Sequence, residues 1–308
     1  MKSKSSALHL ALVSLTIGGA AALLPWSAAA APTAVVEGVQ MPAWVERGGT
    51  KLPLAAGMEL KESDRLSTGQ NSRVLLRLAE GSQVKLGENA LLTLDKLGQR
   101  QENKSVFLEG VLDVARGAFR FTSDVKSKIA SRRQVDIRVA TVTAGIRGTD
   151  LWGKSAADRD IVCLIEGRIS VQRETDAPVV MDQALQFYIA PKTADGKADR
   201  SKPAPTLAAV GMEQLMQWAT ETEIAAGQGA ARKGGKFKVV AAASTNQNDA
   251  LKVYDQLRTA GYAAEIFPAG TAQQRVYEVR IGGLPSKAEA DALGSRIEAI
   301  TGSKGRPA

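Results

Sequence analysis

The chain has 308 residues, of which 44% are hydrophobic and 23% charged, with a net charge of +8 at pH 7; this length predicts two domains, and this charge is compatible with an anionic wall or membrane surface. The only histidine, His9, lies at the start of the chain, which excludes Ser-His-Asp catalysis and histidine-based zinc sites elsewhere. The only cysteine, Cys163, excludes an intramolecular disulfide.

The first thirty residues have the pattern of a secretory signal peptide. Two lysines precede an apolar run from Leu8 to Leu24, and the small residues Ala28–Ala31 follow it. We expect cleavage after Ala30, so that residues 1–30 are removed and the protein reaches the periplasm. The alternative is an uncleaved anchor, which the glycines and polar residues within the run disfavour. No later stretch approaches the ~18 apolar residues of a transmembrane helix, so we expect no membrane span in the mature chain.

Residues 35–172 form a series of short strand patterns separated by glycine and polar turns. Arg73–Leu78 and Ala90–Leu94 are typical of the series, and Val135–Val142 and Ile161–Val171 close it. Many short, evenly spaced strands with turn residues between them predict an all-β roll or sandwich. Cys163 stands within one apolar strand, where we expect a buried and inert thiol because no base is available to activate it.

Three motifs in this region follow one another in a fixed order. They are Gly57-x-x-Leu-x-x-x-Asp64-x-Leu-x-Thr68-Gly69, then Ile146-Arg-Gly-Thr-Asp150, then Glu166-Gly-Arg-Ile-Ser-Val171. The set resembles the FecR domain, whose signature is an Arg-Gly-Thr step between two late strands. The resemblance implies a β domain that serves as a scaffold or protein-docking module. The step itself is either a partner-binding loop or a backbone bend at glycine with Arg147 paired to Asp150 or Glu166; we favour the bend.

Residues 173–235 are predicted to connect two domains. They contain a strand-like run at Leu185–Ile189, and Thr206–Ala226 carries apolar residues at helical spacing. The glycines and basic residues of Gly227–Gly235 are typical of a flexible linker. We therefore expect that cleavage there releases two folded pieces.

From Lys236 onward, strand and helix patterns alternate. Apolar residues alternate at the start of Phe237–Ala241, and Ser286-x-x-Glu289 is a capping box ahead of a helix that Gly302 ends. No apolar run follows Gly302, so the sequence predicts no final strand. The order β-α-β-β-α over residues 236–302 predicts a small open-faced α/β sandwich with both helices on one side of the sheet.

Two strands of this region carry a second family resemblance. Phe237-Lys-Val-Val-Ala and Tyr277-Glu-Val-Arg-Ile-Gly282 resemble the two halves of a SPOR domain, although Val240 replaces a usual glutamine and Ser244 a common aromatic residue. The resemblance implies a sheet of the ferredoxin or RNP kind that binds the denuded glycan strands of peptidoglycan. It also implies a place in the cell envelope and a connection with cell division.

Candidate glycan-binding residues follow from the alternation of side chains along a strand. Lys238 and Val240 share one face of the first strand, and Glu278 and Arg280 share the corresponding face of the third. These four residues are left on the open face if the alternate residues of the two strands pack under the helices: Phe237, Val239, Tyr277, Val279 and Ile281. On the open face, charged donors and an acceptor suit sugar hydroxyl and N-acetyl groups. The five candidate glycan-binding residues are therefore Lys238, Val240, Asn246, Glu278 and Arg280. The alternative is a solvated face without a ligand.

The sequence favours binding over catalysis. An RNA-binding sheet would present two or three aromatic residues, and residues 236 to 302 hold eight basic against seven acidic residues, so we expect no nucleic-acid partner. We expect no cofactor and no metal, and a non-catalytic envelope protein that binds peptidoglycan and docks envelope proteins through its β domain. The alternative is a periplasmic adaptor or signalling protein without glycan affinity. An enzyme acting on wall glycan is disfavoured, because no pair of acidic residues shows a spacing that would fix the carboxylate separation of a glycosidase.

Overall fold

The structure is a computed structural model that describes residues 33–308 apart from 103–104, 125–131, 147, 204 and 272–273. Pro32–Ala308 form one compact unit. The predicted signal peptide and Arg147 lie outside the described residues. None of the described helices has the length and apolar character needed to cross a membrane.

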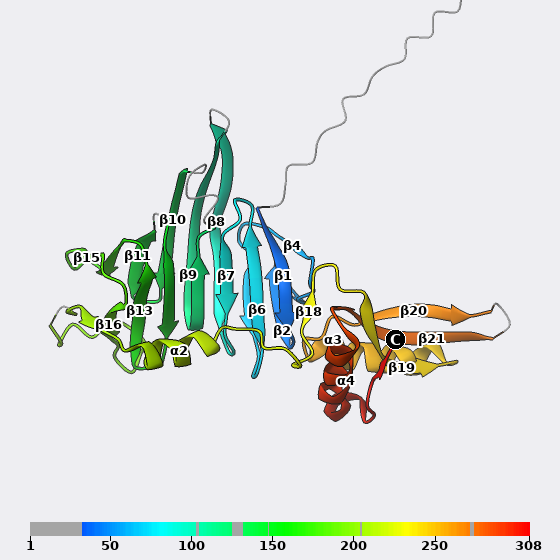
Figure 1. The fold of residues 1–308 in the computed structure, drawn as a ribbon. Coiled ribbons are helices and arrows are strands. Elements are labelled where there is room, and N and C mark those ends of the chain that lie inside the picture. The colour runs from blue at the N-terminus through cyan, green and yellow to red at the C-terminus, as the bar shows by residue number, and fades with distance from the viewer. Residues whose placement is uncertain (1–32, 103–104, 125–131, 147, 204, 272–273) are drawn as a thin grey trace, which may run out of the picture. The chain divides into compact units, whose positions relative to one another are not determined.

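The first part of the chain is an all-β domain of two sheets, as predicted (Figure 1). The first sheet contains β1 (Ala34–Gln40), β4 (Glu59–Leu60), β6 (Arg73–Leu78), β7 (Gln83–Leu86), β12 (Asp150–Ser155), β13 (Arg159–Glu166), β16 (Gln186–Pro191), β17 (Ala208–Ala209) and β18 (Ala231–Arg232). The second sheet contains β2 (Ala43–Arg47), β3 (Thr50–Pro53), β5 (Arg65–Thr68), β8 (Leu91–Glu102), β10 (Arg132–Val139), β11 (Val142–Ile146), β14 (Ile169–Arg173) and β15 (Val179–Met181).

One long strand, β9 (Ser105–Thr122), belongs to both sheets. Its first half pairs with β8 and β10 in the second sheet, and its second half pairs with β7 and β12 in the first. The strand changes sheet next to Gly117, whose φ is 88°. A Cβ at Gly117 would lie 2.5 Å from the Cα of Ala90, so the close approach of the two sheets requires glycine there.

Alternating side chains of the two sheets fill one hydrophobic core. In β6, for example, Val74, Leu76 and Leu78 are buried while the residues between them are not. Phe119 and Phe121 come from β9 and are fully buried. The sheet continues beyond the expected end at residue 172, because β13 has a free edge that pairs with β16 over Arg159–Cys163.

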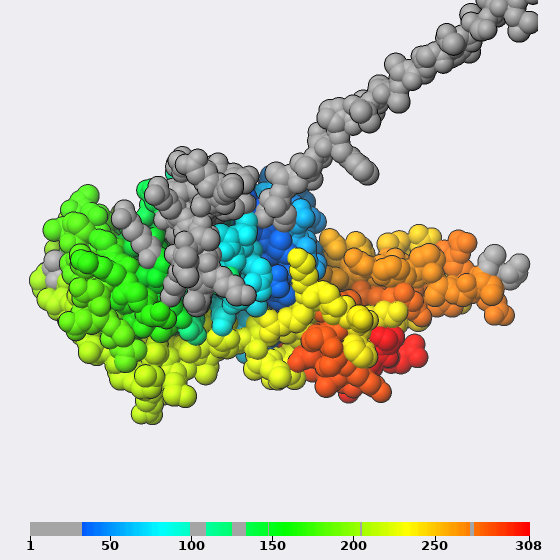
Figure 2. Space-filling view, turned by 45° about the horizontal axis from the view of Figure 1, so that its top comes forward, coloured from blue at the N-terminus to red at the C-terminus, as the bar shows by residue number. Residues whose placement is uncertain are grey.

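The segment between β17 and β18 covers part of the outer surface of the first sheet. Helix α2 (Met212–Thr220) places Trp218 flat on Trp152, with ring centroids 4.7 Å apart and an interplanar angle of 2°. Beyond the helix, Glu221 and Glu223 form ion pairs with cations of the sheet. We call residues 210–223 the strap; its yellow-green atoms lie along the lower edge of the green atoms in Figure 2.

The chemistry of the strap matches the surface beneath it. A row of paired residues crosses the outer face of the first sheet at one level: Lys85, Arg120, Trp152, Cys163 and Phe187. Strap residues Leu215 and Trp218 cover the apolar half of the row, and Glu223 pairs with its two cations. The helix pattern predicted from its apolar residues is therefore a cover for the sheet.

Cys163 lies under this cover and is fully buried. Desolvation, with a smaller effect from the charge of Asp150, raises the pKa of its thiol from 9.0 to about 12. The thiol is therefore protonated near neutral pH, and thiols react as thiolates. We predict that iodoacetamide at pH 8 leaves the folded protein unlabelled and labels Cys163 fully in denaturant, as measured by mass spectrometry. Labelling of the folded protein at the denatured rate would contradict this burial.

The C-terminal region has the order β-α-β-β-α-β. It contains β19 (Phe237–Ser244), α3 (Gln247–Thr259), β20 (Glu265–Gly270), β21 (Arg275–Leu284), α4 (Lys287–Thr301) and β22 (Arg306–Pro307). The strand order in its sheet is β20-β21-β19-β22, and all pairs are antiparallel. Both helices pack on one face of this sheet (Figure 1), as predicted, with Val239, Val279 and Ile281 in the shared core.

The expectation that a final strand is missing is wrong, because β22 pairs with β19 through Arg306 and Pro307. The sequence shows no strand pattern for β22, because backbone contacts rather than alternating apolar side chains position this strand. After Gly302 ends α4 with a φ of 74°, Gly305 donates to Gly294 O over 3.1 Å. A Cβ at Gly294 would lie 2.4 Å from the oxygen of Gly305, so the chain crosses the helix only where both residues are glycine.

The glycine-rich segment before β19 differs from the flexible linker that its composition predicts. The carboxylate of Glu289, at the start of α4, accepts bonds from the backbone N–H groups of Gly227, Gly229 and Ala230 at 2.6, 2.6 and 3.1 Å. Next, β18 pairs with β1, and Lys233 N donates to Glu37 O over 2.9 Å. These bonds give the segment a defined path along the compact unit.

Candidate functional site

The face of the C-terminal sheet that the helices leave uncovered is the candidate site. Directly paired residues of neighbouring strands point to the same face. One such row runs across all four strands as Glu265, Arg280, Val240 and Arg306. A second row brings Phe267 beside Glu278. Since Val279 and Ile281, the neighbours of Arg280 in β21, are buried under the helices, both rows lie on the open face.

Arg280 is held in place by an acid and an aromatic ring. Its Nε donates to Glu278 Oε2 over 2.6 Å, and its guanidinium carbon lies 5.0 Å from the centroid of the Phe267 ring. The side chains of Arg280 and Glu278 are each 22% exposed. A guanidinium has five N–H donors, so a fixed Arg280 keeps donors for a ligand. The predicted placement of Glu278 and Arg280 on one face agrees with this geometry.

The three other predicted site residues have different surroundings. Lys238 is half-buried and its backbone exchanges two hydrogen bonds with Ala308. Val240 shares the open face but is only 7% exposed, because it lies between Arg280 and Arg306 in its row. Asn246 is the N-cap of α3, where its side chain accepts a bond from Asn248 N over 2.9 Å.

Two aromatic residues that were expected under the helices differ from each other. Tyr277 is half-buried and packs against the core, as expected. Phe237 is 40% exposed, so its assignment to the packed face is wrong. It pairs with Leu284 at the start of β19, and the register shifts between Phe237 and Val239.

Sequence reasoning missed three residues of the open face, Glu265, Phe267 and Arg306. Phe267 is 39% exposed and belongs to β20. The alternation of Glu265, Ile266 and Phe267 was an available signal, since Ile266 packs on the core and its neighbours must then face outward. Arg306 lies in β22, which has no recognisable strand pattern, so no sequence signal pointed to it.

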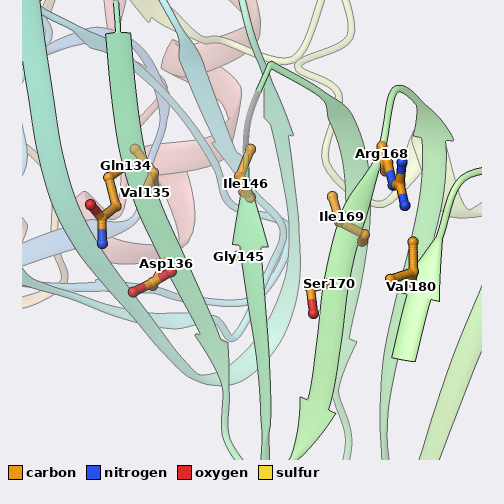
Figure 3. A pocket seen from close by; sticks show the side chains of 9 residues that line it. All are labelled: Gln134, Val135, Asp136, Gly145, Ile146, Arg168, Ile169, Ser170 and Val180. Carbon is orange, nitrogen blue, oxygen red and sulfur yellow. The ribbon is translucent and has the colours of Figure 1, made fainter. Parts of the chain in front are cut away.

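The β domain has a hollow of about 580 Å³ on its second sheet, apart from the candidate site. Asp136, Gly145, Ser170 and Val180 are paired in one row across β10, β11, β14 and β15. Gly145 leaves bare backbone in the middle of the row, with Asp136 on one side and Ser170 on the other (Figure 3). The edge strand β15 pairs only with β14 among the described strands.

Gly148 of the Arg-Gly-Thr step lies in a bend. Gly148 has a φ of 77°, and Thr149 is fully buried with its N–H bonded to Ser123 Oγ at 3.0 Å. The carboxylate of Asp150 receives two bonds from Arg120, at 3.0 and 2.7 Å. The expected partner Arg147 lies outside the described residues, so Arg120 is the partner of Asp150 that the structure describes.

Two family models match the chain. Residues 64–170 match the FecR protein family, and residues 233–305 match the SPOR domain. These matches confirm the architecture suspected from the sequence motifs, in which a FecR region precedes a C-terminal SPOR domain. Both families are typical of envelope proteins, and a SPOR domain implies peptidoglycan binding.

More distant similarity exists among solved structures. Two crystal structures of a candidate anti-sigma factor from Parabacteroides distasonis ATCC 8503, at 1.65 and 2.50 Å resolution, align with 77% and 79% of this chain and 92% and 96% of theirs. Sequence identities are 11% and 12%, and TM-scores are 0.38 and 0.37, values that carry no argument about function. No curated protein matches the sequence.

Proposed function

We propose that this protein is exported to the periplasm and binds the denuded glycan strands of peptidoglycan, without catalysis, through the open face of its SPOR domain. The observation that carries the proposal is the row Glu265, Arg280, Val240 and Arg306 beside the exposed ring of Phe267. Charged donors, a carboxylate acceptor and an aromatic surface lie together on a face that no helix covers.

The chemistry of this face suits a sugar polymer. Hydroxyl and N-acetyl groups bond both to guanidinium donors and to carboxylate acceptors. Fixing Arg280 through Glu278 and Phe267 lowers the entropic cost of ordering it when a ligand binds. The five residues predicted from the sequence thus reduce to Glu278 and Arg280 as the main polar contacts, with Phe267 and Arg306 added.

The β domain is proposed as the protein-docking module. The hollow around Gly145 supports this, because it places donors and acceptors beside the short edge strand β15, and an edge strand can accept another extended chain. A signalling or adaptor role in which both domains bind proteins is the alternative. The altered residues Val240 and Ser244 favour that alternative, since they replace side chains usual in the SPOR family.

Co-sedimentation with sacculi distinguishes these functions. The purified protein is mixed with intact sacculi and with sacculi from which an amidase has stripped the stem peptides. Preference for stripped sacculi supports glycan binding. Absence of binding to both supports the adaptor, and release of soluble fragments from purified sacculi would instead reveal an enzyme.

Arg280→Ala is expected to weaken binding to stripped sacculi by about 1.5–3 kcal/mol, the range for a hydrogen bond to a charged group. Phe267→Ala should weaken it by about 0.5–1.5 kcal/mol through the lost ring surface. Sedimentation isotherms measure both losses.

Arg275→Ala is the matched control, because Arg275 is an exposed arginine of the same strand. Its place in the alternation of side chains puts it on the face opposite to Arg280. This control should bind normally. If Arg280→Ala binds normally while a folded Tyr277→Ala protein does not, the ligand occupies the opposite face and the proposed site is wrong.

A further inference from the structure

A second row of paired residues lies on the outer face of the first sheet, independent of the SPOR domain. Val74 pairs with Leu86, and Leu86 pairs with Phe119. The next residues of these three antiparallel strands, Arg73, Gly87 and Ala118, therefore also lie side by side. Gly87 N donates to Ala118 O over 2.9 Å, and Ala118 pairs with Lys154. The row therefore places two small residues between two cations.

This arrangement leaves a cavity of about 350 Å³. Ala118, which lines the cavity, is too small to fill the space between Arg73 and Lys154. The strap limits the cavity above, since a Cβ at Gly87 would lie 2.7 Å from the backbone oxygen of Glu221. Arg73, Arg116 and Lys154 line it from three different strands, and Glu88 and Glu221 also line it.

Only one of the three cations is neutralised by a described acid. Lys154 Nζ lies 2.8 Å from Glu221 Oε2. Arg116 Nε donates to Asn89 O over 2.9 Å, and Arg73 donates to Ser72 O over 2.8 Å, but these acceptors are uncharged backbone oxygens. Within the described residues, Arg73 Nε is buried and has no hydrogen-bond partner, which costs free energy.

We propose that this cavity binds a single oxyanion group, a carboxylate or a phosphate, between Arg73 and Arg116. Planar guanidinium groups donate paired hydrogen bonds to both kinds of oxyanion. The ligand would accept charge-assisted bonds from both side chains. Glu88 Oε2 accepts Asn71 N over 2.7 Å, and as a lining carboxylate it opposes the anion and limits its affinity.

Titration of the purified protein with inorganic phosphate, and separately with acetate, tests the proposal. Calorimetry at constant ionic strength measures binding in both arms, and the better probe indicates whether phosphate or carboxylate ligands are the natural source. We expect saturable binding that weakens about tenfold or more in Arg73→Gln and in Arg116→Gln, the loss for one charge-assisted bond. Glu88→Gln should strengthen binding, since it removes a negative charge from the wall.

Arg138→Gln is the matched control, because Arg138 is an exposed arginine of the second sheet that pairs with Asp95. It should bind like the wild type. Arg116 is exposed, so its variant remains informative if Arg73→Gln fails to fold by circular dichroism. Absence of saturable binding to both probes, or equal affinity in the wild type and in Arg116→Gln, would overturn the proposal.

Discussion

Asp160→Ala is expected to lower the free energy of unfolding by about 3–5 kcal/mol, the range for removing one partner of a buried ion pair. Asp160 is fully buried. Its Oδ1 accepts a bond from Lys192 Nζ at 3.1 Å, and its Oδ2 accepts bonds from the N–H and hydroxyl of Thr141 at 2.9 and 2.7 Å. Because the Lys192 side chain is only 6% exposed, the change leaves a buried ammonium without its ion-pair partner.

Urea unfolding followed by circular dichroism measures this loss. Asp158→Ala is the matched control, two residues away, because the Asp158 side chain is 61% exposed and pairs with the exposed Arg159. Exposed ion pairs contribute little to stability, so the control should unfold like the wild type. Equal midpoints for the two variants would contradict the assigned burial of Asp160.

Glu289→Ala is expected to lower the free energy of unfolding of the C-terminal region by about 2–6 kcal/mol, the cost of two buried donors without an acceptor. Two of its three backbone donors, Gly229 N and Ala230 N, are buried. A buried donor that loses its acceptor costs about 1–3 kcal/mol. The lost bonds should also release the segment Gly227–Gly235, so that proteases cut it faster than in the wild type.

Limited proteolysis with mass spectrometry locates the cuts, and thermal unfolding measures the stability. The control is Glu298→Ala, which changes an exposed acid of the same helix and should leave both measurements unchanged. Rapid cutting of the wild type within Gly227–Gly235 would mean that Glu289 does not hold this segment, and would restore the flexible linker expected from composition.

Local patterns in the sequence identified the architecture. Alternating strands and ordered glycine motifs predicted an all-β FecR-like domain, and strand-helix alternation predicted a small α/β SPOR-like domain; both predictions are confirmed. The capping box also formed, with Glu289 N bonded to Ser286 Oγ at 3.2 Å. These features depend on side chains close together in the chain, and local periodicity and capping record such interactions directly.

Contacts between distant residues were decided only by the tertiary structure. The Glu289 carboxylate accepts hydrogen bonds from residues about sixty positions earlier. Asp160 is buried although it follows the exposed pair Asp158 and Arg159, and β22 forms through contacts between Gly294 and Gly305. On the open face, Phe267 joins Arg280 because β20 pairs with β21. Register and backbone approach determine such pairings, and a single sequence carries no periodic signal for either.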